Sequence, residues 1–289
     1  MEYALEVRGL RKVYGSFTLD PVTFSLPAGG IMGFVGQNGA GKTTTIRLIL
    51  NMASRDGGEV KVFGSDNLKD EREVKQQIAA VFDEIFFVDS WKVGGVERAI
   101  GGFYDKWDSA AYAAYLKRFE LPRERRIKEL SRGMKMKLML AVAMSHGARL
   151  LILDEPTSGL DPVARDELLD ILREYVAGGE RSVLFSTHIT SDLERVAGYI
   201  TLIDHGRVFY TGEKDGLLDH FRVISGQKSE LADDLRRKLI GLSLTASGFS
   251  GMLRAADASG LPGGLTIKEP DIDEVLIYIS KEAHTHEWS

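Results

Sequence analysis

The first 65 residues alternate between apolar and polar positions in the manner of β-strands. Leu5 and Val7 lie on one predicted face, and similar runs occupy 22–26, 31–36 and 59–64. Side chains of a strand alternate between its two faces, so this two-residue period indicates strands with one buried face. The pattern predicts an N-terminal β-rich layer.

Residues 70–147 show a different pattern. Turn signals are few there, and charged residues are mixed with apolar residues in the manner typical of helices. Strand-like runs return at 149–156, 182–188 and 199–204, and the helical pattern "VARDELLDILREYV" separates the first two. Strands that alternate with helices favour a mainly parallel sheet with helices on its faces. The predicted fold class is α/β with an all-helical insert.

The pattern changes again after Gly212. Leucines recur at helical spacing within 229–240, branched apolar residues do so within 271–280, and a stretch rich in glycine and serine separates them. We expect this part to form a small α+β appendage. The predicted domains are 1–83 with 147–212 as the core, 84–146 as the helical insert and 213–289 as the appendage.

Composition excludes several classes of function. The 289 residues include no cysteine, so disulfides, thiol catalysis and cysteine-based zinc sites are excluded. The net charge of −5 argues against a general affinity for nucleic acid. The longest apolar runs, such as 150–153, are far shorter than the roughly 20 residues that span a bilayer, and the N-terminus lacks a secretory signal. A cytoplasmic protein is expected.

The segment "GQNGAGKTT" at 36–44 matches the phosphate-loop pattern, follows a predicted strand and opens a predicted helix. Its glycines let successive backbone N–H groups face phosphate oxygens, Lys42 would reach the β- and γ-phosphates, and the Thr43 hydroxyl would bind Mg²⁺. A glycine-rich turn of purely structural role would not explain the Lys-Thr pair. The predicted nucleotide-binding residues of this loop are Gly36, Asn38, Gly39, Gly41, Lys42, Thr43 and Thr44.

Two further candidates for phosphate chemistry follow buried strands. Asp154 and Glu155 come at the carboxyl end of "LLILDEP", where ligands bind in open α/β sheets. Asp154 would hold Mg²⁺, and Glu155 would polarise the attacking water. His188 ends the next strand, and its imidazole would donate a hydrogen bond to the γ-phosphate. Alternatively, the carboxylates are a solvated turn and His188 is a satisfied surface group.

Two predicted helix starts complete the set. Ser131 and Gly133 in "LSRGMKMKL" open a helix whose free N–H groups suit an anion. Asp161 in "SGLD" precedes Pro162 and reads as the N-cap of another helix. This capping role does not exclude a second role for Asp161 at the nucleotide.

Taken in order, these motifs resemble the ATP-binding subunit of ABC transporters over about residues 3–212. The resemblance implies two subunits facing head to tail, with each nucleotide held between the phosphate loop of one chain and Ser131 and Gly133 of the other. It also implies that Tyr14 stacks on adenine, although Tyr14 could equally be a half-buried strand residue. ATP and Mg²⁺ are the implied ligands.

The sequence departs from the family pattern at three places. The usual signature L-S-G-G-Q is replaced at its third and fifth positions by Arg132 and Met134. The glutamine expected before the helical insert is replaced by Asp83, or by Glu84 if the register slips, and a carboxylate there can still contact Mg²⁺. These residues and the extended C-terminus resemble ATPases of bacterial exporters, including antibiotic and peptide export groups.

The resulting hypothesis is an ATPase that drives separate integral membrane subunits from the inner face of the cell membrane. A helix of the membrane partner would dock near "EIFFVDSW" at 84–91, where Phe86, Phe87 and Trp91 either receive it or pack inside the insert. The rival hypotheses are a soluble ABC ATPase of some other assembly and a degenerate regulatory subunit. The appendage would support the dimer, gate the ATPase or cover a sheet edge.

Overall fold

The computed structural model describes residues 2–82 and 86–287, with side chains as far as 282. The chain divides into two units, which meet between Val208 and Phe209 in sequence. No helix in the described part of the chain combines the length and the apolar character that a membrane span requires.

The first unit begins with an antiparallel sheet whose strand order is β2-β1-β4-β5. Leu5 and Val7 of β1 are both fully buried, as the sequence pattern predicts, and Ala4 and Leu10 are buried as well. Phe24 of β2 packs on Phe34 of the next strand, with ring centroids 5.3 Å apart. The strands are β1 (Tyr3–Val13), β2 (Thr18–Pro27), β4 (Gly57–Val62) and β5 (Ser65–Asp66).

The second, mainly parallel sheet has the order β10-β9-β3-β8-β7-β6, and β10 runs across the division between the units in sequence. The pairs β3–β8, β3–β9, β7–β8 and β6–β7 are all parallel. Every residue of β3, β7 and β8 is buried, as expected of strands covered on both faces. The strands are β3 (Ile31–Val35), β6 (Ile78–Val81), β7 (Leu150–Asp154), β8 (Ser182–Thr187), β9 (Tyr199–Asp204) and β10 (Arg207–Glu213).

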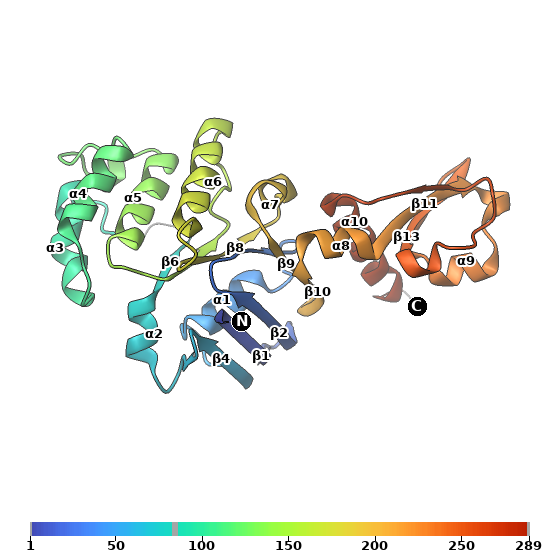
Figure 1. Ribbon diagram of the computed structural model, residues 1–289, viewed down its shortest axis with the longest axis horizontal. Coiled ribbons are helices and arrows are strands. Elements are labelled where there is room, and N and C mark those ends of the chain that lie inside the picture. The colour runs from blue at the N-terminus through green and yellow to red at the C-terminus, as the bar shows by residue number, and fades with distance from the viewer. Residues whose placement is uncertain (1, 83–85, 288–289) are drawn as a thin grey trace. The chain divides into compact units, whose positions relative to one another are not determined.

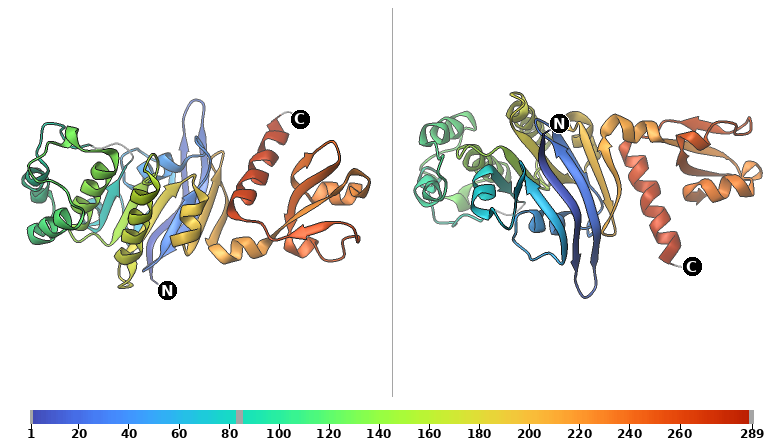
Figure 2. Two further views of the ribbon diagram at one scale, coloured as in Figure 1. Left: turned by 90° about the horizontal axis from the view of Figure 1, so that it is seen from above. Right: turned by 60° about the horizontal axis from the view of Figure 1, so that its bottom comes forward.

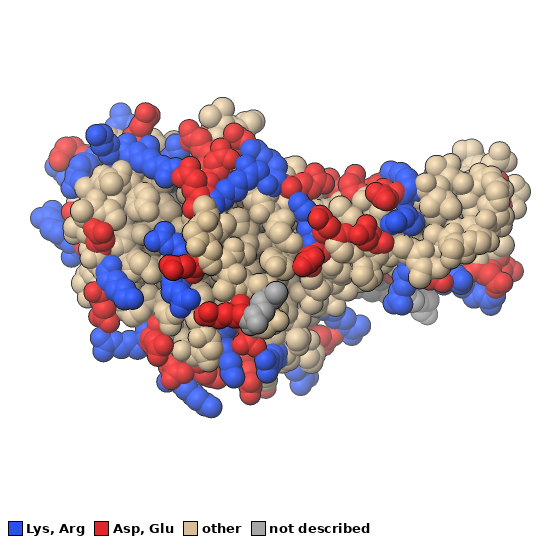
Figure 3. Space-filling model, viewed as in Figure 1, with Lys and Arg blue, Asp and Glu red and all other residues tan. Residues whose placement is uncertain are grey.

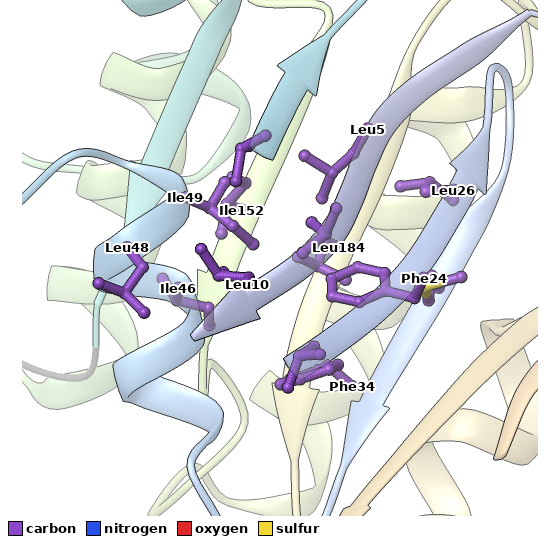
Figure 4. Close-up of a cluster of buried hydrophobic side chains, with 14 of the residues drawn as sticks. Leu5, Leu10, Phe24, Leu26, Phe34, Ile46, Leu48, Ile49, Ile152 and Leu184 are labelled. Carbon is purple, nitrogen blue, oxygen red and sulfur yellow. The ribbon is translucent and has the colours of Figure 1, made fainter. Parts of the chain in front are cut away.

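The main core lies between the antiparallel sheet, α1 and the parallel sheet (Figure 4). Leu5 and Leu10 of the first sheet, Ile46 and Ile49 of α1, and Ile152 of β7 meet there with almost no exposed surface. At roughly 25 cal/mol for each Å² of buried apolar surface, these contacts are the main stabilising term of the unit. They hold α1, and with it the residues before α1, against the ends of the strands.

The helices of the first unit are α1 (Lys42–Ile49), α2 (Glu71–Gln77), α3 (Val96–Ile100), α4 (Ser109–Arg118), α5 (Arg132–Met144), α6 (Pro162–Val176) and α7 (Thr190–Val196). Helices α3, α4 and α5 gather at one end of this unit (Figure 1). The helical reading of 70–147 is wrong at Ile78–Val81, because β6 joins the parallel sheet beside β7. Four residues are too few for periodicity to separate a strand from a helix.

The second unit contains an antiparallel sheet of order β12-β13-β11-β14 together with the helices α8, α9 and α10 (Figure 2). Ile224, Leu235, Leu239 and Phe249 belong to its own apolar core. The helix predicted at 229–240 is only the six residues of α9. The elements are α8 (Lys214–His220), β11 (Phe221–Gln227), α9 (Asp233–Lys238), β12 (Ile240–Leu244), β13 (Gly248–Arg254), β14 (Thr266–Lys268) and α10 (Ile272–Glu287).

Candidate active site

The loop at 36–44 joins β3 to α1 and is shaped by its glycines. Gly39 and Gly41 have φ angles of 83° and 111°, which L side chains rarely adopt. Gly36 is required for a different reason, because a Cβ built there would lie 2.2 Å from the carbonyl oxygen of Ile203. The N-terminus of α1 has no side-chain cap, so its first N–H groups remain available to an anion.

Lys42, the first residue of α1, folds its side chain back over this loop. Its Nζ donates to the carbonyl oxygen of Gly36 at 2.7 Å and to that of Gln37 at 3.2 Å. The same atom lies 3.1 Å from Glu155 Oε1. Only 6% of Lys42 is exposed, and a buried ammonium needs such partners because desolvation of a charge is costly. The carbonyls and the carboxylate hold this cation at the mouth of the loop.

Thr43 and Asp154 come together at the carboxyl end of β7. The Thr43 hydroxyl donates to Asp154 Oδ2 at 2.8 Å, and the Ser186 hydroxyl donates to Asp154 Oδ1 at 2.6 Å. Asp154 is 7% exposed. Hydroxyl and carboxylate oxygens are ligands that Mg²⁺ accepts, and this ion is usually held by one or two carboxylates together with substrate phosphates. The pair fits such an ion, and no cluster of three or more metal-ligating side chains occurs in the described residues.

Glu155 and His188 meet beside this pair. His188 Nδ1 lies 2.8 Å from Glu155 Oε2, and the Glu155 amide donates to the Ser186 hydroxyl at 3.0 Å. Glu155 has a φ of 51°, in the left-handed region that non-glycine residues seldom occupy. Its Oε1 is buried, and in the described structure it accepts no hydrogen bond despite the nearby Lys42 ammonium. A buried carboxylate oxygen without a hydrogen bond is available to accept one from water or substrate.

Ser186 is the site residue that the sequence analysis did not identify. It contacts both acidic residues, since its hydroxyl donates to Asp154 and accepts from the Glu155 amide. Asp154 and Ser186 are directly paired in the β7–β8 ladder. The available sequence signal was weak: a serine two residues before His188, on a strand parallel to the one that carries Asp154.

Ser131 and Asp161 begin two helices that line one cavity. Ser131 Oγ accepts from the Met134 amide at 3.3 Å, and Asp161 Oδ1 accepts from the Val163 and Ala164 amides at 3.0 Å each. The predicted caps of α5 and α6 are thereby confirmed. The cavity has a volume of about 500 Å³ and is lined by residues at the starts of both helices, with Gly133 among them, and by the residues just before α6.

Arg132 also lines this cavity. Its guanidinium occupies the space beside Gly159, where a Cβ would lie 2.6 Å from one of the guanidinium nitrogens. Gly159 has a φ of 67°, so both backbone conformation and space exclude a side chain. None of the described residues that line this cavity comes from the phosphate loop at 36–44. The two predicted anion sites are therefore separate places on the chain.

The other residues predicted to bind the nucleotide or Mg²⁺ lie in different parts of the chain. Tyr14 follows the end of β1 and is 43% exposed, with Lys12 Nζ 5.6 Å from its ring centroid. Asn38 is exposed and Thr44 is half-buried. The predicted magnesium ligand Asp83 and its alternative Glu84 lie outside the described residues.

The aromatic residues proposed for docking differ in burial. Phe86 is 70% exposed, whereas Phe87 and Trp91 are half-buried. A cavity of about 590 Å³ lies between α1, α2, β6 and the segment that follows α3, and it is lined by Met52, Arg72, Phe103 and other residues. Met52 and Phe103 are 57% and 74% exposed. Exposed large apolar groups at a cavity are typical of protein contact surfaces.

The chain resembles known proteins along most of its length. Residues 19–158 match the family described as ABC transporter. The daunorubicin/doxorubicin resistance ATP-binding protein DrrA of Streptomyces peucetius is 37% identical over 216 residues, which cover 72% of this chain and 65% of that protein. The Nod factor export ATP-binding protein I of Paraburkholderia xenovorans is 33% identical over 226 residues, which cover 75% and 73%. A solved "ATP binding subunit of ABC transporter" has a TM-score of 0.68 at 28% identity and covers 74% of this chain and 91% of its own.

Proposed function

Because the chain belongs to the ATP-binding proteins of ABC transporters, a family of ATPases coupled to transport, we propose that it is the ATP-hydrolysing motor of an exporter. The observation that carries the proposal is the convergence of Lys42, Asp154, Glu155 and His188 at the carboxyl ends of β7 and β8 and the start of α1. These are the groups that phosphoryl transfer to water needs: a phosphate cradle, a metal site, a base and a hydrogen-bond donor.

Each residue of the site has its own role in this chemistry. The loop amides at 36–44 and Lys42 hold the phosphates and neutralise charge that develops on them. Glu155 accepts the proton of the attacking water at Oε1, the oxygen that lies 3.1 Å from Lys42 Nζ, while His188 contacts the other carboxylate oxygen. Thr43 and Asp154 would hold Mg²⁺, which supplies charge neutralisation at the β- and γ-phosphate oxygens when bound. Ser186 keeps both acidic residues in place.

Completion of the site requires a second ATPase subunit. The cavity at the starts of α5 and α6 offers Ser131, Gly133 and two helix N-termini, yet it contains none of the phosphate-loop residues. In the head-to-tail arrangement of the family, this cavity faces the nucleotide of the neighbouring chain. A phosphate there would be stabilised by the N–H groups and the positive ends of both helices.

The membrane partner is proposed to dock at the cavity lined by Met52, Arg72 and Phe103 or at the exposed Phe86. Apolar groups flanked by charges suit an amphipathic helix of a cytoplasmic loop. Docked in this way, the chain would lie at the inner face of the cell membrane beside integral membrane subunits. Export is favoured because the names of the similar proteins refer to drug resistance and to Nod factor export.

The decisive experiment measures the solution mass of Glu155→Gln by light scattering, with and without ATP and Mg²⁺. This substitution keeps the hydrogen-bonding shape of the side chain but removes the base, so the closed dimer should accumulate. We expect an ATP-dependent change from monomer to dimer that Ser131→Arg abolishes. Glu155→Gln should also lose turnover while it still binds ATP.

The control is Lys42→Ala, which should remain monomeric because it binds ATP poorly. Dimerisation that proceeds equally without ATP would contradict the proposal, and so would normal hydrolysis by purified Glu155→Gln. A Glu155→Gln protein that binds ATP but stays monomeric would contradict the homodimer and leave a paralogous second subunit as the partner.

A further inference from the structure

Asp192 is a buried acidic residue that the proposed mechanism does not use. It lies in the first turn of α7 and is only 1% exposed. Its Oδ2 has no hydrogen-bond partner among the described residues. The cation that pairs with it is Arg165 of α6, whose Nε lies 4.0 Å from Asp192 Oδ1. That Nε is also buried and without a hydrogen bond in the described structure.

The distance between these two groups is significant. At 4.0 Å the charges attract each other, but a hydrogen bond between nitrogen and oxygen requires about 2.7–3.2 Å. A buried carboxylate that lacks hydrogen bonds is costly, and so is a buried guanidinium nitrogen in the same condition. A displacement of roughly 1 Å would bring Arg165 Nε within hydrogen-bond distance of Asp192 Oδ1 and give that nitrogen the acceptor it lacks. The pair therefore favours a second arrangement in which α6 and α7 lie slightly closer.

Arg165 and Asp192 each come four residues after a residue of the candidate site, Asp161 and His188 respectively. The Arg165 amide donates to the carbonyl oxygen of Asp161, the N-cap of α6. Asp192 comes four residues after His188, and α7 begins only two residues after it. The two helices run beside each other in the first unit (Figure 1). The pair thus joins the segment that faces a neighbouring subunit to the histidine that contacts Glu155.

We propose that Arg165 and Asp192 are positioning residues for ATP hydrolysis, and that their contact closes when a second subunit presses on residues 158–161. Closure draws the start of α7 toward α6 and holds His188 in the 2.8 Å contact that it already makes with Glu155 Oε2. The inference rests on the proposed ATPase function and adds to it the route by which the neighbour acts on this chain's own site.

The same two helices provide a matched control. Arg195 of α7 forms an ion pair with Asp166 of α6, but these side chains are 40% and 53% exposed. An exposed pair contributes little, because water screens the charges and competes for them. The visible face in Figure 3 shows acidic and basic side chains mixed in this way over the first unit. Asp166→Asn therefore removes an α6–α7 ion pair without touching the buried one.

The test compares steady-state ATP hydrolysis by Arg165→Gln, Asp192→Asn and Asp166→Asn with that of the unsubstituted chain. Misplacement by about 1 Å costs on the order of 10- to 100-fold in rate. We expect kcat to fall by about that factor in Arg165→Gln and Asp192→Asn. KM for ATP should stay within about twofold, because the phosphate loop is unchanged. Asp166→Asn should keep normal kinetics.

A second comparison shows whether the pair acts through His188. In a His188→Ala background, Arg165→Gln should lower kcat no further, because residues that act as a unit are not additive. Arg165 has a partly exposed side chain, so Arg165→Gln keeps the test valid if Asp192→Asn fails to fold.

Three results would overturn the inference. They are a kcat of Arg165→Gln within about twofold of the unsubstituted chain, an equal loss in Asp166→Asn, and a full further loss in the His188→Ala background. Absence of hydrolysis by the unsubstituted chain, with bound ATP and Mg²⁺ demonstrated, would instead refute the proposed function itself.

Discussion

His146 gives this chain a stability that depends on pH in a calculable way. The residue lies between α5 and β7, is 2% exposed, and stacks on Tyr104 with ring centroids 3.8 Å apart. Its Nδ1 has no hydrogen-bond partner in the described structure. Burial lowers the pKa of His146 from its ordinary 6.5 to about 4.

Whether acidification stabilises or destabilises the fold depends on which state, folded or unfolded, binds the proton at the higher pH. Below pH 6.5 the unfolded chain protonates His146 whereas the folded chain does not until about pH 4, so acidification stabilises the unfolded state. Each pH unit in this interval costs about 1.4 kcal/mol, which amounts to about 2 kcal/mol at pH 5 and about 3 kcal/mol at pH 4. The folded chain therefore keeps its full free energy of unfolding above pH 6.5 and loses this amount as the pH falls toward 4.

Urea unfolding of the unsubstituted chain and of His146→Phe at pH 8 and pH 5 measures this contribution. Phenylalanine keeps an aromatic ring over Tyr104 but binds no proton. The loss of unfolding free energy between the two pH values should be about 2 kcal/mol larger in the unsubstituted chain. At pH 8 His146 is neutral in both states, so the difference in unfolding free energy between the two proteins at that pH measures the change in packing alone. Equal losses in both proteins would refute the reasoning, since every other titrating group is shared.

Three substitutions test the candidate site itself. Gly36→Ala should displace the phosphate loop at a cost of about 1–3 kcal/mol, because its Cβ would meet the Ile203 carbonyl oxygen, and calorimetric titration with ATP should show weaker binding. Tyr14→Ala should weaken ATP binding by about 0.5–1.5 kcal/mol if the ring stacks on adenine, whereas Tyr3→Ala, at the other end of β1, should bind normally. Asp161→Ala should cost about 1 kcal/mol of unfolding free energy, measured in denaturant, because it leaves the Val163 and Ala164 amides uncapped; an unchanged midpoint would contradict the capping role.

The parts of the site that sequence could predict are those determined within a few consecutive residues. The phosphate loop needs glycine, lysine and threonine at fixed spacing, and the caps of α5 and α6 need only Ser131 and Asp161 just before a helix. The strand that carries Asp154 is recognisable from its own apolar run. In each case the local chain contains the whole physical reason.

The parts that sequence missed depend on contacts between distant segments. Ser186 contacts Asp154 only because β7 and β8 pair in one particular register. Strand β6 was read as helix because its four residues carry no distinguishing period, and its identity comes from its pairing with β7. Likewise, nothing near Asp192 in sequence predicts Arg165 as its partner.

The left-handed backbone at Glu155 has a consequence for protein engineering. A non-glycine residue at a φ of 51° carries about 1–2 kcal/mol of strain that glycine would relieve. Glu155→Gly would relieve this strain, but it would also remove the proposed base and the carboxylate that lies 3.1 Å from the buried Lys42 ammonium. Any Glu155→Gly variant that a selection for thermal stability retains would lack the base for ATP hydrolysis, so such a selection must screen for turnover as well as melting temperature.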